Sequence, residues 1–88
     1  MSYEVEFSKG ALKQFNKLSP ELQERIQTKI DELAENPRPD GVAKLKNGDN
    51  RYRVKVSNYR ILYNISDDIL LVTVVRVGHR REVYREDK

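Results

Sequence analysis

Hydrophobic and polar positions recur with two different periods along the chain, dividing it into a helical first half and a strand-rich second half. Residues 3–7 alternate between apolar and acidic side chains, as in a half-buried strand. From Ser8, a suitable N-cap, apolar residues recur at helical spacing to about Leu18. Ser19 followed by proline starts a second helix, which we expect to run to about Glu35 before a proline-containing segment ends it.

The second half is rich in valine, isoleucine, leucine and tyrosine, which are typical of strands. We expect three strands, at residues 51–56, 60–66 and 69–77. The linkers 57–59 and 67–68 are short enough for hairpins. Residues 44–46 fit either a loop or a short extra pairing, and residues 83–85 can add a short edge strand.

This order of elements predicts an α+β domain. An N-terminal strand precedes a hairpin of two helices, and an antiparallel β-meander follows, with the helices packed on one face of the sheet. The nearly continuous apolar run of residues 69–75 favours a central strand, covered over most of its length. A chain of 88 residues is too short to divide into two useful cores, so we expect one domain over residues 1–88.

Composition narrows the classes of protein that this chain can belong to. Hydrophobic residues make up 38% and charged residues 35%, and no apolar run approaches the roughly 20 residues that a membrane helix needs. The first residues are acidic and alternating, unlike a signal peptide. With no cysteine and one histidine, thiolate and multi-histidine metal centres are excluded. We therefore expect a cytoplasmic protein with no metal, no cofactor and no membrane partner.

Charge is distributed unevenly along the chain, although the formal net charge is only +3. Residues 1–40 hold 6 Lys and Arg against 8 Asp and Glu, whereas residues 41–88 hold 11 against 6. Such asymmetry between halves favours a nucleic acid or an acidic protein as the partner. A solvated basic surface with no ligand explains the same numbers.

Strand alternation gathers cations on one face of the predicted sheet. Because alternate side chains point to opposite faces, Arg53, Lys55 and Arg60 are expected on the open side, away from the helices. We expect Arg60, like Arg80, to be exposed to solvent. No Asp or Glu occurs between Arg51 and Ser66 to neutralise them. Like charges on neighbouring strands repel one another, so this arrangement favours a bound anion. A polyanion such as RNA is the substrate that we expect.

The residue types present can support cleavage of RNA by its own 2′-hydroxyl group. Negative charge gathers on the phosphoryl oxygens in the transition state, and fixed guanidinium groups stabilise it. His79 can serve as a base or an acid because its reference pKa is about 6.5. Tyr84 can hydrogen-bond the reacting groups or stack on a base. Each of these residues alone is compatible with an ordinary surface position, and the argument rests on their combination.

Four stretches of the sequence resemble the RelE family of bacterial and archaeal toxins, within the wider RelE/ParE superfamily. They are Lys44-Leu45, Tyr52-Arg53-Val54-Lys55-Val56, Tyr59-Arg60-Ile61-Leu62-Tyr63 and Val77-Gly78-His79-Arg80-Arg81-Glu82-Val83-Tyr84. The third stretch is shared across the superfamily, and the basic strand before it and the C-terminal stretch narrow the resemblance to RelE.

The resemblance implies the toxin of a type II toxin–antitoxin system. Such a protein is an mRNA interferase, a metal-independent endoribonuclease that cleaves mRNA in the A site of the 70S ribosome and inhibits translation. A co-expressed antitoxin is expected to wrap the toxin and to displace or cover its C-terminal segment.

The resemblance also implies a role for individual residues. Arg53 and Lys55 correspond to the two basic strand positions near the scissile phosphate, and Arg60 to the arginine that stabilises the phosphate. Arg80 corresponds to the arginine that stabilises the leaving group or the transition state, and Tyr84 to the tyrosine that orients the RNA. Further basic residues expected to contact RNA or the ribosome are Lys44, Lys46, Arg51, Arg81 and Arg85.

Some positions depart from the family pattern. Arg53 stands where lysine is common, and arginine is a much poorer proton acceptor. The general base is therefore expected to be Lys55 or His79, the latter standing where some relatives have lysine. A glutamate base of the kind expected in YoeB-type toxins is not expected here, because residues 41–46 contain no acid.

Two other functions remain compatible with the sequence. A ParE-like inhibitor of DNA gyrase shares the Tyr-Arg-Ile-Leu-Tyr stretch and cleaves nothing. It has no chemical need for the cationic strand together with His79, Arg80 and Tyr84. A basic module that binds RNA or an antitoxin and has lost its activity is the second alternative.

Overall fold

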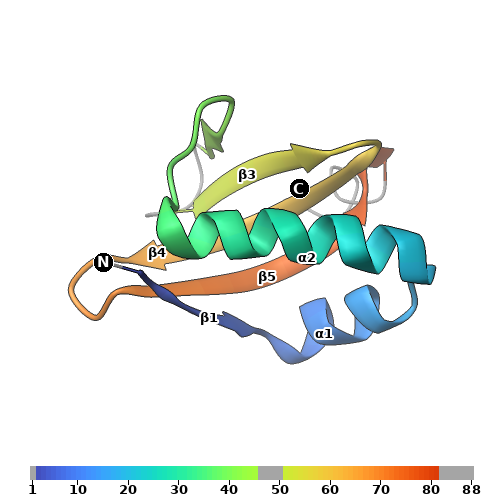
Figure 1. The fold of residues 1–88 in the computed structure, drawn as a ribbon, viewed down its shortest axis with the longest axis horizontal. Coiled ribbons are helices and arrows are strands. Elements are labelled where there is room, and N and C mark those ends of the chain that lie inside the picture. Colours follow the sequence, from blue (N-terminus) through green and yellow to red (C-terminus); the bar gives the residue numbers. More distant parts are fainter. Residues whose placement is uncertain (1, 46–50, 82–88) are drawn as a thin grey trace.

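The computed structural model describes residues 2–45 and 51–81, in which two helices pack on a five-stranded sheet (Figure 1). The elements in chain order are β1 (Glu4–Phe7), α1 (Lys9–Asn16), α2 (Pro20–Glu35), β2 (Ala43–Lys44), β3 (Arg51–Val56), β4 (Tyr59–Ser66) and β5 (Leu71–His79). The strands lie in the order β1-β5-β4-β3-β2. The predicted α+β fold, with its helical hairpin and antiparallel meander, is confirmed.

Three details differ from the expectation or complete it. The N-terminal strand pairs in parallel with the last one, β1 with β5, whereas the other neighbours are antiparallel. Residues 43–44 make the short extra pairing, with β3. The prediction that the last strand begins at Ile69 is wrong, because that side chain is 64% exposed in a turn and the strand begins at Leu71. The suggested edge strand at 83–85 lies outside the described residues.

Both helices begin at the predicted caps. The side-chain oxygen of Ser8 accepts a hydrogen bond from the backbone N–H of Ala11 at 3.1 Å, and that of Ser19 accepts one from Leu22 at 3.3 Å. A serine at this position satisfies a backbone donor that the first turn of a helix leaves unpaired. The proline after Ser19 stabilises the start of α2, because its fixed φ suits the first helical position.

Helix α1 ends two residues earlier than predicted, at Asn16. The N–H groups of Lys17 and Leu18 bond the carbonyls three residues before them, which tightens the last turn and ends the helix. The side-chain amide of Gln23 then donates to carbonyls of this turn, at Phe15, Asn16 and Leu18. A single residue of α2 therefore closes the corner of the hairpin.

The core lies between the helices and one face of the sheet. Its buried members include Ala11, Ile26, Ile30, Leu33, Tyr52, Val54, Ile61, Tyr63, Ile65, Val72, Val74 and Val77. Tyr63 is fully buried, and its hydroxyl donates to the backbone carbonyl of Pro37 at 2.7 Å. Burial raises the pKa of Tyr63 above its ordinary value, so this phenol stays a neutral hydrogen-bond donor.

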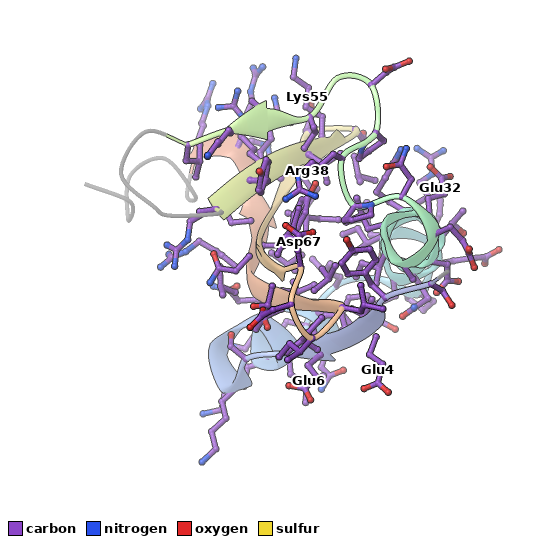
Figure 2. All side chains as sticks on the ribbon, turned by 90° about the vertical axis from the view of Figure 1, so that its left-hand side faces the viewer. Glu4, Glu6, Glu32, Arg38, Lys55 and Asp67 are labelled. Carbon is purple, nitrogen blue, oxygen red and sulfur yellow. The ribbon has the colours of Figure 1, made fainter. Side chains whose placement is uncertain are left out.

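A polar clamp joins four distant segments at the end of the sheet near the N-terminus. The guanidinium of Arg38 binds both carboxylate oxygens of Asp67, at 3.2 and 2.8 Å, and the hydroxyl of Tyr3 donates to the same carboxylate at 2.7 Å (Figure 2). The Nε atom of Arg38 donates to the hydroxyl of Tyr52 at 3.1 Å. The hydrogen bonds from Arg38 and Tyr3 hold the pKa of Asp67 below its usual value.

We expect Asp67→Asn to lower the thermal midpoint at neutral pH, because Arg38 loses its charged partner. The folded pKa of Asp67 lies below the reference value of 3.8, so the carboxylate stabilises the fold above that value. Its contribution is lost as the pH falls through the folded pKa, and the difference between wild type and variant should shrink there. Thermal unfolding followed by circular dichroism across pH measures both effects.

The matched control is Asp68→Asn, since Asp68 is exposed in the same turn. Equal midpoints at pH 7 for the Asp67 and Asp68 variants would contradict a stabilising role for the clamp.

Candidate active site

The register of β3, β4 and β5 arranges the open face of the sheet in rows. Arg51, Asn64 and Thr73 form one row; Arg53, Leu62 and Arg76 form the next; Lys55, Arg60 and Gly78 form the third. Five cations lie on this face, and the three strands contain no Asp or Glu. The predicted placement of Arg53, Lys55 and Arg60 on one face is confirmed.

The open face is basic at one side and acidic at the other. Glu4 and Glu6 of β1 pair in register with Leu71 and Thr73, so they share the face with the arginine rows. Figure 2 shows these two glutamates at one end of the molecule and Lys55 at the other. An extended polyanion is therefore attracted to β3 and β4 and repelled from β1.

The expectation that Arg60 is exposed is wrong. Its side chain belongs to the open face but only 7% of the residue is accessible, because β4 is the middle strand of the three. Its Nη1 atom donates to the carbonyls of Ser57 and Tyr59, at 3.3 and 3.0 Å. Its Nε atom is buried and has no hydrogen-bond partner within residues 2–45 and 51–81. Alternation predicts which face a residue occupies, but not how deeply its neighbours cover it.

The β3–β4 turn connects Arg60 with Arg80. Carbonyls on either side of Asn58 bind the Arg60 guanidinium, and the carbonyl of Asn58 accepts from the backbone N–H of Arg80 at 2.9 Å. Ser57 adopts a φ of 57°, which turns the chain sharply here. The side chains of Arg80 and Arg81 are exposed. The side chain of Arg60 and the backbone of Arg80, 20 positions apart in the sequence, are thus hydrogen-bonded to the same turn.

His79 lies at the margin of the basic face. It pairs in register with Tyr59, which places it on the helix-facing side of the sheet, one residue beyond Gly78. Its ring packs edge-on against Tyr59 with centroids 5.7 Å apart, and its Nδ1 atom accepts from the backbone N–H of Arg81 at 3.3 Å. Lys55, in contrast, stands directly opposite Arg60 on the basic face.

The remaining predicted contact residues are not all brought together. Lys44 pairs in register with Tyr52, which places it on the other side of the sheet from Arg53. Arg51 lies on the basic face, where its Nε atom donates to Oδ1 of Asn64 at 3.1 Å. Lys46, Tyr84 and Arg85 lie outside the described residues.

Sequence reasoning missed Arg76, which shares a row with Arg53 and Leu62. The fully buried Leu62 lies between these two arginines, whose long aliphatic stems can cover it. Arg76 stands two positions before Gly78, so alternation along β5 places both residues on the open face of the sheet. An irregularity in the register of β4 with β5 hid it, because Val75 is passed over between the pairs of Val74 and Arg76.

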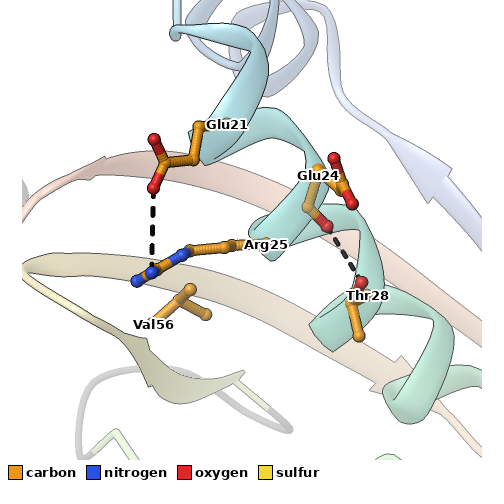
Figure 3. A pocket seen from close by; sticks show the side chains of 5 residues that line it. All are labelled: Glu21, Glu24, Arg25, Thr28 and Val56. Atoms are coloured by element: carbon orange, nitrogen blue, oxygen red, sulfur yellow. Dashed lines mark hydrogen bonds and ion pairs between the residues drawn. The ribbon is translucent and has the colours of Figure 1, made fainter.

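A separate groove lies on the helix-facing side, between α2 and the end of β3. It encloses about 380 Å³ and is lined by Glu21, Glu24, Arg25, Thr28 and Val56 (Figure 3). A weak ion pair of 3.7 Å joins Glu21 and Arg25 at its rim. The groove lacks the dense positive charge of the open face, which makes the open face the stronger candidate for an anionic substrate.

In residues 2–45 and 51–81, no three His, Asp or Glu side chains are grouped so that they could hold a metal ion. None of the helices formed by these residues is both long and apolar enough to cross a bilayer.

Comparison with known proteins shows the family. The sequence model of the "ParE toxin of type II toxin-antitoxin system, parDE" matches residues 5–84. The mRNA interferase toxin RelE of Escherichia coli K12 is 36% identical over 90 residues, which cover 98% of this chain and 94% of that protein. The chain belongs to the RelE family of toxins.

Solved structures of RelE proteins share the fold as well as the sequence. The isolated E. coli RelE toxin matches with a TM-score of 0.80 and 35% identity, over 97% of this chain and 94% of that one. The toxin in the intact E. coli RelBE toxin–antitoxin complex also matches with a TM-score of 0.80, at 32% identity, over 89% of this chain and 96% of that one. These matches favour the RelE interpretation over the gyrase inhibitor that the superfamily name alone allows.

The burial of Arg60 leads to a prediction about stability. Arg60→Ala removes two hydrogen bonds from a charged donor to the β3–β4 turn, so we expect it to lower the free energy of unfolding by about 1–3 kcal/mol. Urea unfolding measures this cost.

Lys55→Ala is the matched control, because Lys55 is exposed and directly opposite Arg60. Its removal relieves a like-charge pair and should change the stability by less than about 0.5 kcal/mol. Equal stability of the Arg60 variant and wild type would contradict a structural role for the buried guanidinium.

Proposed function

We propose that this RelE-family chain is the toxin of a type II toxin–antitoxin system and acts as an mRNA interferase, cleaving mRNA in the ribosomal A site. The observation that carries the proposal is the acid-free cationic face of β3–β5, with the guanidinium of Arg60 fixed on its middle strand. Its relative in E. coli is named an mRNA interferase. Translating ribosomes are the target, which places the action in the cytoplasm.

The reaction that suits these residues is attack of a ribose 2′-oxygen on the adjacent phosphorus. The 2′-hydroxyl gives up its proton to a base, and the bond from phosphorus to the 5′-oxygen of the next nucleotide breaks. That oxygen takes up a proton from an acid or from water, which leaves a cyclic 2′,3′-phosphate and a free 5′-hydroxyl. A guanidinium already held by the turn carbonyls, as that of Arg60 is, needs little reorganisation to stabilise the phosphoryl charge. Arg53 on the same face can bind the other phosphate oxygen, and the chemistry needs no metal.

Lys55 and His79 are the candidates for the proton acceptor. Lys55 is favoured by its position directly opposite Arg60, whereas His79 approaches from the margin of the face. Arg80, whose backbone N–H is bonded to the β3–β4 turn, is assigned the stabilisation of charge on the departing 5′-oxygen. Tyr84 is assigned the orientation of the RNA because it matches the C-terminal tyrosine of the family.

An antitoxin is the proposed protein partner. The E. coli relative has been solved in an intact complex with its antitoxin. A partner of the same kind that carries acidic side chains would neutralise the cationic rows and exclude RNA from them.

Arg80→Ala tests the function without disturbing the core, because the Arg80 side chain is exposed. We expect it to lower the rate of A-site cleavage on the order of 100-fold, as loss of one transition-state donor does. Primer extension on mRNA translated in a reconstituted system gives the cut sites and their rate. Arg25→Ala, an exposed arginine on α2, controls for the loss of one positive charge.

Absence of cuts by the wild-type protein, together with growth arrest on its overproduction, would overturn the nuclease proposal. Inhibition of DNA supercoiling by purified gyrase would then assign the chain to the ParE-like alternative.

A further inference from the structure

Arg51 and Asn64 form a fixed pair on the basic face, one strand apart. They are directly opposite in the register of β3 and β4, and the Nε atom of Arg51 donates to Oδ1 of Asn64 at 3.1 Å. Both residues are partly buried. A guanidinium that bonds a neutral amide through Nε keeps its full charge, and its orientation is set before any ligand arrives. This is what distinguishes it from a mobile surface arginine.

The pair stands apart from the reacting centre. Arg51 and Lys55 are both on β3, separated by four residues, which corresponds to about 13 Å along a strand. Because Asn64 holds the Arg51 guanidinium in its own row, Arg51 is not placed to share the phosphate that Arg60 and Lys55 are proposed to contact. Arg53 lies between Arg51 and Lys55 on the same face, so β3 carries three cations at regular intervals. The phosphates of an extended RNA strand also recur regularly along its backbone.

Glu6 limits the direction in which such a strand can run. The row of Arg51 and Asn64 continues through Thr73 to Glu6 on β1. A phosphate bound at Arg51 is attracted along β3 towards Arg53 and repelled from β1. Charge therefore favours a path parallel to β3 over one that crosses the sheet.

We propose that Arg51, oriented by Asn64, binds a phosphate of the substrate mRNA other than the scissile one, so that the strand lies along β3. Arg51 contacts the substrate, and Asn64 is a positioning residue. The proposal rests on the proposed mRNA cleavage and adds to it a second point of attachment, which sets the register of the strand relative to Arg60.

Kinetics on programmed ribosomes test the pair. Arg51→Ala should raise KM about tenfold, as expected for the loss of one charged hydrogen bond, with kcat unchanged. Asn64→Asp should raise KM similarly without lowering the thermal midpoint, because the new carboxylate holds Arg51 in place but neutralises it. Arg25→Ala should change neither constant. Unchanged KM in both the Arg51 and Asn64 variants, or a fall in kcat alone, would overturn the proposal.

Replacing single phosphates of the mRNA with uncharged linkages identifies the phosphate that Arg51 contacts. Short mRNAs with one methylphosphonate at successive positions around the cleavage site should show one flanking position that raises KM for the wild type. That position should have no effect on Arg51→Ala, while the others act equally on both proteins. If no position behaves so although Arg51→Ala weakens binding, Arg51 contacts ribosomal RNA and the proposal is wrong.

The same experiment separates this proposal from the function on which it rests. Wild-type cleavage of the unmodified message tests the interferase itself. Cleavage that is retained with no interference at any flanking phosphate rejects the Arg51 contact alone.

Discussion

The antiparallel register of β3 with β4 is the constraint on which the rest of this structure depends. It sets Tyr52 opposite Tyr63 and Val54 opposite Ile61 on the helix-facing side, where they complete the core. The same register sets Lys55 opposite Arg60 on the other side. A shift by one residue would move every cation into the core and every tyrosine out of it, so packing of the core and assembly of the basic face are one event.

Local patterns were sufficient for the elements, and long-range pairing was not. Both helix caps follow from Ser8 and Ser19 themselves, and a period of 2 in the sequence predicts the core face of β3 and β4 and the shared face of Arg53, Lys55 and Arg60. The parallel partner of β1 and the depth of Arg60 depend on which strands become neighbours, and no local period specifies that. The irregular register near Val75 interrupts the alternation, which is why Arg76 was not found.

On the basic face, like charges lie directly opposite one another, and their repulsion lowers the stability of the fold. Arg60 reduces that cost by bonding carbonyls of its own turn. The arrangement agrees with a surface that is completed by an anion, whether a nucleic acid or an acidic partner protein. The match to RelE, together with the cation rows, points to the same class of ligand from independent observations.

The parallel pairing of β1 with β5 has a consequence for the synthesis of the protein. Residues 4–7 hydrogen-bond to a strand whose partner positions are 71–74, near the opposite end of the sequence. Contacts of such high sequence separation slow folding, because the long intervening chain must be closed into a loop before they form. During translation, the first strand must wait for β5 to leave the ribosome, so the sheet is completed only after residues 71–79 have emerged. A growing chain that has not yet released β5 thus lacks both the partner of β1 and the strand that carries Arg76 on the basic face.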